Sequence, residues 1–264
     1  MTDEERLVWR RFEKLERQVL ERGQSLELDD ETRTILSESA QLVAISPTDI
    51  EDALRGISTA TTLLREISRR LAEGSKRERK SYSQVDRLRE QGDFAGARKV
   101  LEDALAVEIV PYYREQLEIR LDHLATLEEI FSTGHVEEDF HPWEQIRVLA
   151  LRVRLGKPLE LRDDLRDFLR QTAPSVAISE AEAEAALETR EDAETLLEKM
   201  MERIWEGQQR IKQALTRMMN CQEAGDPEGA RQGMRDVLAV EVVPQYRQMA
   251  EECLRNCDKP PPDW

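Results

Sequence analysis

The sequence is internally duplicated, and this duplication limits the folds that are open to it. Aligning Gly23 with Gly156 sets an offset of 133 residues. The offset holds without a gap for about 100 positions, of which about forty are identical. The longest match joins 105–114 (LAVEIVPYYR) to 238–247 (LAVEVVPQYR), and upstream Trp9 aligns with Trp143 if one residue is deleted. A repeat of this length indicates two copies of one domain.

The repeat sets the expected domain limits. We expect one copy at 3–128 and the other at 140–258, with a linker at 129–139. Residues 132–139 are polar and lack apolar periodicity, as is typical of a connection. The segment 259–264 contains three consecutive prolines and is expected to form an extended tail.

The composition predicts an all-α fold. Ala, Leu, Glu and Arg dominate, and aromatic residues make up only 5% of the chain. These residues lose little side-chain freedom in a helix, whereas β-branched and aromatic residues lose more. We therefore expect a tandem duplication in which each copy has about five helices and ends in a long helical hairpin.

Local signals place the helices of the first copy. Thr2 and Glu5 form a capping-box pattern before a helix over about 3–22, and Gly23 follows as its C-cap. Its apolar stripe is predicted to be Leu7, Phe12, Leu15 and Val19. A second helix is expected from Asp29 or Asp30 to about Gln41. Ser46 and Pro47 then begin a third helix, and in the second copy Ser179 and Glu182 form a full capping box.

A long amphipathic helix is predicted over about 59–91. Gly74, and Gly207 in the second copy, fall on its apolar seam, which indicates either the close approach of a partner helix or a local break. The last helix begins near Phe94 and is interrupted at Pro111, because proline lacks the amide hydrogen and clashes with the preceding turn. It is expected to resume over 113–124.

Charge and cysteine content narrow the functional classes. The net charge of −16 is spread over both halves, which disfavours binding to DNA or RNA. No apolar run is long enough to span a membrane, and the acidic N-terminus does not look like a signal peptide. Three cysteines, an odd number, lie only in the second half and favour a reducing, cytoplasmic location.

Several motifs together resemble a known family. They include Thr62-Leu-Leu-Arg-Glu-Ile67, Glu73-Gly-Ser75, and Gly-Asp-x-x-Gly-Ala-Arg leading into Leu-Ala-Val-Glu-x-Val-Pro-x-Tyr-Arg. The pattern is similar to the DUSAM domain, a paralogous family of myxobacterial proteins, and it covers nearly the whole chain twice. The resemblance implies a soluble protein of uncharacterised function, and it supplies no active-site residues.

Histidine and cysteine positions do not predict a metal or redox site. His135 and His141 are six residues apart in the expected linker, and His123 has no counterpart in the second copy, so no helical ligand pair results. Cys221 and Cys257 replace leucines of the first copy and are interpreted as small core residues. Cys253 lies beside two glutamates, which disfavours a reactive thiolate.

Two charged features have a functional and a structural interpretation. Glu108 and its counterpart Glu241 lie within apolar runs before the break proline and fit either an acid or base with a raised pKa or a structural ion pair. We favour the ion pair, with these candidate partners: Arg98, Arg114, Arg231 and Arg247. The basic cluster 76–80 fits either phosphate binding or a solvated helix face, and we favour the face.

The sequence thus favours a non-enzymatic protein–protein interaction or regulatory adaptor module. No catalytic, cofactor or metal residues are assigned, and no cofactor, nucleic acid or membrane is expected as a partner. The partner is expected to be a protein, and homo-oligomers are possible in principle. The alternative is an acidic inhibitor or immunity-type protein that binds a basic toxin or nucleic-acid enzyme. An enzyme would need convergent titratable groups that neither copy offers.

Overall fold

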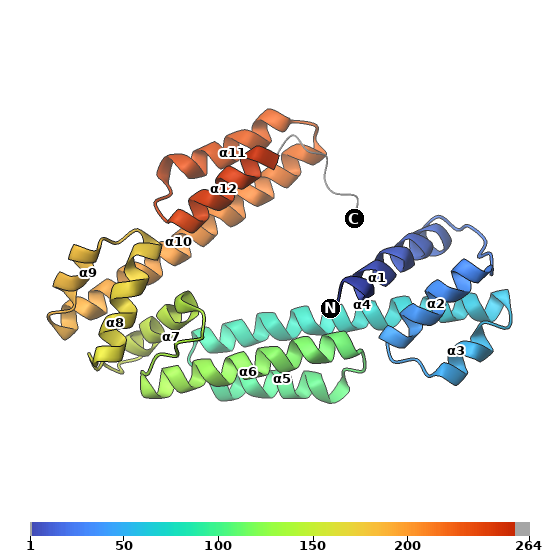
Figure 1. Cartoon of the computed structure of the whole chain (residues 1–264), viewed down its shortest axis with the longest axis horizontal. Coiled ribbons are helices and arrows are strands. Elements are labelled where there is room, and N and C mark those ends of the chain that lie inside the picture. The colour runs from blue at the N-terminus through green and yellow to red at the C-terminus, as the bar shows by residue number, and fades with distance from the viewer. Residues whose placement is uncertain (1, 257–264) are drawn as a thin grey trace. The chain divides into compact units, whose positions relative to one another are not determined.

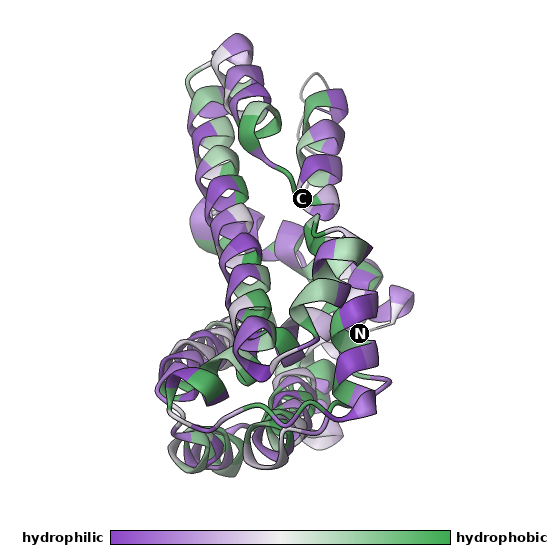
Figure 2. Cartoon of the chain, turned by 90° about the vertical axis from the view of Figure 1, so that its left-hand side faces the viewer, coloured by the Kyte–Doolittle hydropathy of each residue, from purple (hydrophilic) through white to green (hydrophobic). Residues whose placement is uncertain are grey.

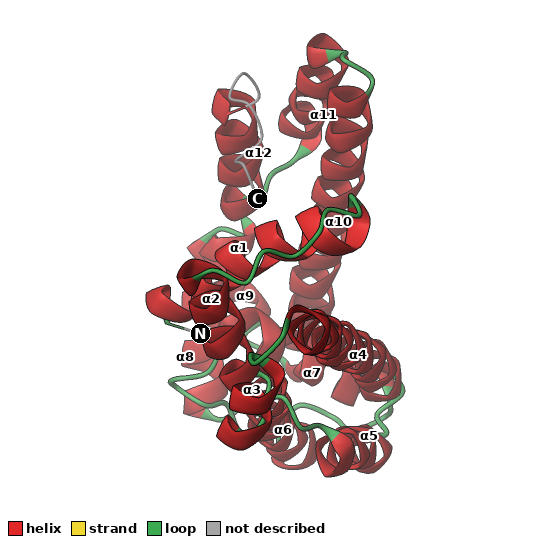
Figure 3. Ribbon diagram, turned by 90° about the vertical axis from the view of Figure 1, so that its right-hand side faces the viewer, coloured by secondary structure: helices red, strands yellow, loops and turns green. Residues whose placement is uncertain are grey.

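Helices are the regular elements of the part of the chain that the structure describes. The computed structural model describes residues 2–256, and within them every regular element is a helix (Figure 3). Hydrophilic and hydrophobic residues alternate along these helices (Figure 2), as expected when each buries one face. Among residues 2–256 no helix is both long and apolar enough to cross a membrane. The all-α prediction is confirmed.

The chain divides into two compact units, Met1–Ala125 and Thr126–Trp264. The elements of the first are α1 (Asp3–Glu16), the π-helical turn η1 (Arg17–Glu21), α2 (Asp30–Leu42), α3 (Pro47–Ala53), α4 (Ile57–Glu90), α5 (Phe94–Val107) and α6 (Pro111–Thr133). Figure 1 labels the α-helices. The last eight residues of α6, from Thr126, belong to the second unit. We call these two parts unit 1 and unit 2.

Unit 2 repeats the order of unit 1. Its further elements are α7 (Pro142–Arg154), α8 (Asp163–Thr172), the 3-10 turn η2 (Ala173–Val176), α9 (Glu180–Ala186), α10 (Arg190–Glu223), α11 (Pro227–Val240) and α12 (Pro244–Asn256). The helices α9, α10 and α11 match α3, α4 and α5 in length and at the offset of 133 residues. The duplication read from the sequence is therefore also a duplication of structure.

Capping residues start the helices where the sequence predicts. Thr2 and Glu5 form the reciprocal capping box, with bonds of 2.7 and 3.2 Å. Ser46 caps α3 ahead of Pro47. Ser179 caps α9 through the amide of Glu182 at 3.2 Å. The full capping box predicted there is wrong, because the Glu182 carboxylate pairs with Lys199 on α10 instead.

The first helix contains the residue that breaks the register of the repeat. Between Trp9 and Gly23 unit 1 has one residue more than unit 2 has between Trp143 and Gly156. The π-helical turn at 17–21 accommodates this residue, because a π turn holds more residues than an α turn. Gly23 then ends the helix at φ +67°. Of the predicted stripe, Phe12 is buried, whereas Leu7 is exposed because Val8 is the residue that faces the core with Phe12.

The long helices α4 and α10 are unbroken at Gly74 and Gly207. Each is about 50 Å long at 1.5 Å per residue. In unit 1, α2 and α3 pack against α4, and so does α5. Leu64 and Ile67 of α4 share a core with Phe12 and Leu36. Of the two interpretations of the glycines, close approach is confirmed, and the residue that approaches is a tyrosine.

The connection between the copies is shorter than predicted. Helix α6 runs to Thr133 rather than ending near Leu124, so residues 129–133 of the expected linker are helical. Ile130 and Phe131 are buried in unit 2, where Arg152 donates to the carbonyls of Phe131 and Ser132. The helix ends where Gly134 takes a left-handed conformation at φ +75° and donates its amide to the carbonyl of Ile130 at 2.8 Å. The expected tail 259–264 lies outside the described residues.

Candidate functional site

The break between α5 and α6 contains a group of buried polar contacts in unit 1. Helix α5 ends at Val107 and α6 begins at Pro111, as the proline predicts. The carboxylate of Glu108 accepts bonds from the amides of Ile109 at 2.9 Å and Val110 at 2.8 Å. These amides precede α6 and would otherwise lack partners in a buried place. Glu108 therefore caps the break on the side where α6 begins.

Arg114 closes the other side of the break. Its guanidinium donates to the carbonyls of Leu105 and Glu108, both at 2.9 Å. Carbonyls at the end of a helix have no intrahelical donor, so a cation there satisfies them and interacts favourably with the helix dipole. Arg114 is one of the two arginines of unit 1, with Arg98, that the sequence offers as ion-pair partners of the Glu108 side chain. That prediction is wrong, because Arg114 binds backbone carbonyls.

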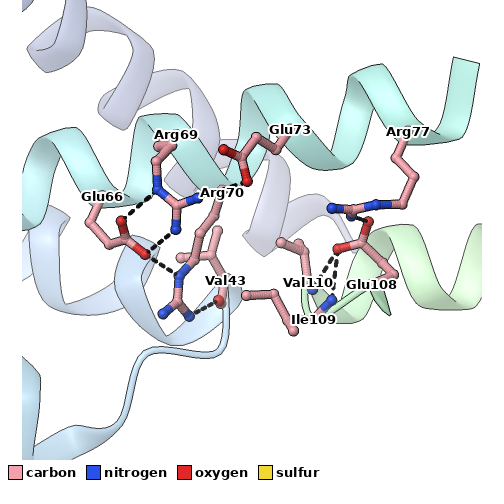
Figure 4. A network of polar contacts seen from close by, with 9 residues as sticks. All are labelled: Val43, Glu66, Arg69, Arg70, Glu73, Arg77, Glu108, Ile109 and Val110. Carbon is pink, nitrogen blue, oxygen red and sulfur yellow. Dashed lines mark hydrogen bonds and ion pairs between the residues drawn. The ribbon is translucent and has the colours of Figure 1, made fainter. Parts of the chain in front are cut away.

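The ion-pair partner of Glu108 comes from α4 and was not expected. Arg77 pairs with the second carboxylate oxygen of Glu108, as Figure 4 shows. The Glu108 side chain is 1% exposed and that of Arg77 is 27% exposed. The structural interpretation of Glu108 is thus confirmed with a different arginine. Arg77 belongs to the basic cluster 76–80, so this cluster is not simply a solvated face.

Unit 2 reproduces the same contacts at the equivalent positions. Glu241 accepts from the amides of Val242 and Val243 at 2.9 and 2.8 Å, and Arg210 pairs with it at 3.0 Å. Arg247 donates to the carbonyls of Leu238 and Glu241. Burial lowers the pKa of Arg210, but the hydrogen bonds and charges of Glu241 and Glu206 together outweigh it, and the pKa is raised. We call the two arrangements the joints of unit 1 and unit 2.

In each joint a tyrosine ring packs directly against a glycine of the long helix. A Cβ atom on Gly74 would lie 2.2 Å from Cδ2 of Tyr113, and one on Gly207 would lie 2.2 Å from Cδ2 of Tyr246. Only a residue without a side chain lets the ring pack this closely. Burial raises the pKa of both tyrosines. The glycines on the seam thus make room for the first turns of α6 and α12.

The joints do not offer a free catalytic group. In each, one carboxylate oxygen is taken by two amides and the other by an arginine, and the glutamate side chain is 1% exposed or less. A general acid or base has to reach a proton of its substrate. The arrangement instead holds the backbone of the break in one shape.

That shape turns apolar side chains toward solvent. Glu108 has an extended backbone, and successive side chains of an extended segment point to opposite sides. Glu108 and Val110 point inward and are buried, whereas Val107 and Ile109 are 59% and 50% exposed. In unit 2 Val240 and Val242 are 61% and 51% exposed. We call these four residues, two in each unit, the joint edges.

Unit 2 also contains a hollow of about 900 Å³. It lies among the N-terminal part of α7, helix α8, the start of α12 and the connection before α7. Its lining includes the aromatic residues Phe140, Trp143 and Phe168, and the acidic residues Glu137, Glu138, Asp164 and Asp167. Among residues 2–256, no lysine or arginine belongs to the lining, and His141 is its only basic side chain. The sequence patterns do not predict this hollow, because its lining residues come from three stretches that lie far apart in the chain, within 136–145, 164–175 and 244–248.

Comparison with known proteins identifies the repeat. A family model described as a protein of unknown function, DUF2379, matches residues 8–124 and again residues 141–257. The chain belongs to the DUF2379 family. It holds two copies of the family's domain, as the internal duplication predicts. No curated protein and no solved structure matches the chain.

The remaining candidates occupy ordinary positions in the two DUF2379 copies. Within residues 2–256 no group of three or more His, Cys, Asp or Glu side chains is placed to hold a metal ion. His135 lies 3.5 Å from Asp164, and His141 accepts a bond from the Trp143 amide at the start of α7. Cys221 and Cys253 are half-buried and free of disulfides. Cys257 lies outside the described residues.

Sequence reasoning missed a set of arginines that bind backbone carbonyls in both DUF2379 copies. Arg70 donates to the carbonyls of Val43 and Ala44, both at 2.9 Å (Figure 4 draws the bond to Val43). Arg203 does the same for Val176 and Ala177. Arg33 and Arg166 bind the carbonyls that end α3 and α9. A signal was present, because all of these arginines are identical between the copies.

Proposed function

We propose that this chain is a non-enzymatic protein-binding module with two equivalent docking surfaces, the joint edges. The observation that carries the proposal is their repetition. Single exposed apolar residues are ordinary on protein surfaces. Here β-branched side chains are at least half exposed at the same two positions of both units, and they belong to the longest match between the copies.

Contacts that stabilise the fold explain most of the residues shared in that match, but they do not explain the shared residues of the joint edges. Within 105–114, Glu108, Val110 and Arg114 make the buried contacts of the joint. Val107 is identical between the units and makes no such contact, since its side chain is mostly in solvent. Retention of an exposed valine is expected if it binds something. A rigid joint also reduces the ordering cost of binding.

Two edges on one chain favour a partner that offers two epitopes. Binding of the second epitope would then be intramolecular and would raise the overall affinity. This arrangement suits a regulatory adaptor, and a second copy of the chain is one partner to be tested. We also propose a cytoplasmic location, which the odd number of cysteines favours. The DUSAM resemblance is consistent with the proposal but adds no activity to it.

The experiment compares capture of partners by the full chain and by edge variants. Val107→Asp with Val240→Asp places a charge on each edge. The matched control is Leu7→Asp with Leu155→Asp, because these leucines are also about half exposed, one in each unit. We expect the edge variant to lose partners that the parent and the control retain. Loss of the same partners by the control would contradict the proposal, as would substrate turnover by the purified chain.

The alternative function is an acidic inhibitor that covers a basic protein. The net charge of −16 and the acidic lining of the unit 2 hollow support it. Such binding would weaken steeply as salt is added, because exposed charges are screened within about 10 Å at 0.1 M salt. Binding through the apolar edges would weaken little. Measuring the affinity of the edge variant for a captured partner over a range of salt concentrations separates the two functions. Binding that this variant retains and that added salt abolishes supports the inhibitor, whereas binding that this variant loses supports the edges.

A further inference from the structure

The hollow of unit 2 has the size and lining of a binding site. Its volume of about 900 Å³ falls within the roughly 300–1,000 Å³ usual for ligand sites. Trp143 is 8% exposed, with its indole nitrogen bonded to Ser175 Oγ at 3.0 Å and its ring 5.4 Å from that of Tyr246. The tryptophan is therefore fixed in place and presents part of its ring to the hollow.

The wall opposite α8 is held by a buried glutamine. Gln145 is 1% exposed, and its amide nitrogen donates to the carbonyls of Glu137 and Phe140 at 2.7 and 2.9 Å. Its side-chain oxygen accepts from the amide of Glu137 at 2.8 Å. These three bonds fix the segment that carries Glu137, Glu138 and Phe140. The hollow is thus formed before anything binds, which lowers the cost of binding.

The charge around the hollow is only partly neutralised. Asp164 is paired with Arg162 and His135, and Asp167 is paired with Arg170. Glu137 and Glu138 are both exposed, and among the described residues no ion pair neutralises their carboxylates. Two unpaired carboxylates therefore stand beside a lining that contains three aromatic residues. Carboxylates and aromatic faces both attract a cation, the latter through the ring quadrupole.

Unit 1 lacks the equivalent features. The position of Phe168 is taken by Ile35, and that of Gln171 by Glu38, which is paired with Arg11 at 2.6 Å. The segment 134–141 belongs to the connection between the copies and has no partner in the gap-free alignment. The hollow is thus specific to unit 2, whereas the joint edges are common to both units.

We propose that the unit 2 hollow receives an arginine-bearing segment of a partner protein. This inference deepens the proposed function and rests on it. A guanidinium group is planar, stacks on aromatic faces and binds carboxylates through a fork of donors, and it is more weakly hydrated than an ammonium group. The hollow supplies both kinds of contact in one place. The hollow binds the charged segment of the partner, and the joint edges bind its apolar surface.

The test titrates the full chain with a fluorescently labelled oligo-arginine peptide and follows anisotropy at low salt. Glu137→Gln with Glu138→Gln should weaken binding about three- to tenfold, as expected for two exposed ion pairs. Phe168→Leu keeps the apolar bulk and should weaken binding about two- to fivefold through loss of the cation–π contact. Oligo-lysine should bind less tightly than oligo-arginine.

The matched control is Glu188→Gln with Glu202→Gln. Both residues are exposed in unit 2, lie outside the lining of the hollow and change the net charge by the same amount. We expect this control to change binding by less than about twofold. Equal weakening by both pairs would overturn the proposal, since it would show attraction to the net charge alone. Absence of oligo-arginine binding would overturn it as well.

A further variant separates this inference from the proposed function. Val107→Asp with Val240→Asp should leave oligo-arginine binding unchanged within about twofold, because neither valine belongs to the lining of the hollow. Failure of the hollow variants would therefore leave the edges standing. If the edge variant captures the same partners as the parent, the proposed role of the edges is wrong. The oligo-arginine titration alone then decides whether the hollow binds a guanidinium group.

Discussion

The two units keep the same joint over different interiors. In unit 1 the part of α4 next to the joint carries Glu78, Ser81 and Tyr82, whereas unit 2 has Ile211, Ala214 and Leu215 at these positions. Tyr82 donates to the carbonyl of Gln116 at 3.0 Å, and burial raises its pKa to about 12. These positions of the long helix are thus polar in unit 1 and apolar in unit 2, whereas the contacts of the joint beside them are the same in both units. The contacts of the joint therefore do not depend on which side chains occupy these neighbouring positions of the long helix.

A second difference lies at the other end of the long helices. In unit 1 Glu66 pairs with Arg69 and Arg70, as Figure 4 shows, and Arg70 binds the carbonyls after α2. In unit 2 Lys199 stands in place of Glu66 and pairs with Glu182, yet Arg203 still binds the equivalent carbonyls. The contact of the arginine with backbone carbonyls is therefore the same in both units, whereas the ion pair between side chains differs. The two copies share the path of the backbone, and the arginine contact depends on that path.

The largest expected effect concerns the buried glutamates. Replacing Glu108 by alanine removes the partner of Arg77 and leaves two amides without an acceptor, which should destabilise unit 1 by about 3 kcal/mol. Glu241→Ala should cost less, about 2 kcal/mol, because Arg210 keeps its bond to Glu206. Urea denaturation combined with hydrogen exchange resolved by unit measures both. An equal or larger loss in unit 2 would break the expected difference between the joints.

The next effect concerns the glycines under the tyrosines. Gly74→Ala and Gly207→Ala should each destabilise their unit by about 1–3 kcal/mol, because the added methyl group overlaps a packed ring. The matched control is Gly233→Ala in α11, where the nearest atom is 3.5 Å away. This change should stabilise unit 2 by up to about 1 kcal/mol through helix propensity. Thermal unfolding of the three variants checks the signs, and a neutral Gly207→Ala would contradict the packing.

A smaller effect depends on pH and separates two glutamates of α4. The hydrogen bond and charge of Arg69 lower the pKa of Glu66 from 4.5 to about 2, so its contribution is complete above pH 4.5 and is lost as pH falls toward 2. Burial raises the pKa of Glu78, so its ionised form opposes folding at neutral pH.

Glutamine variants of these two residues should therefore differ in sign. At pH 7 Glu66→Gln should lower and Glu78→Gln should raise the free energy of unfolding, each by less than about 1 kcal/mol because both groups are partly solvated. The Glu66 difference should shrink as pH falls from 4.5 toward 2, whereas the Glu78 difference should disappear as pH falls toward 4.5, because the folded-state pKa of Glu78 lies above that value. Urea titrations at a series of pH values measure them. A Glu66→Gln difference that persists at pH 2 would show that charge is not its cause.

The smallest expected effect is on the stability of the edge variants. Val107→Asp and Val240→Asp should change the free energy of unfolding by no more than about 0.5 kcal/mol, because both side chains are mostly in solvent. Thermal melting of each variant measures this. A large loss in either unit would mean that the exposed valines serve folding, and the comparison between the edges would no longer support a binding role.

The sequence by itself determined the duplication, the helical class and most helix ends. Capping residues act on amides two or three positions away, so Thr2, Asp29 and Ser46 begin their helices whatever the rest of the chain does. Pro111 and Pro244 likewise break the chain at the predicted place. These are local effects, and a local pattern is sufficient to predict them.

Only the tertiary structure decided which partners the charged residues take and which apolar residues stay exposed. The pairing of Arg77 with Glu108 spans 31 residues, and the continuation of α6 beyond Leu124 accompanies the burial of Ile130 and Phe131 in unit 2. Val107 and Val110 look alike in the sequence, yet one is in solvent and the other in the core. Val110 packs in the core with Phe12 and Leu36, whereas Val107 ends α5 on its solvent side. Packing between helices that are distant in the sequence decides this difference.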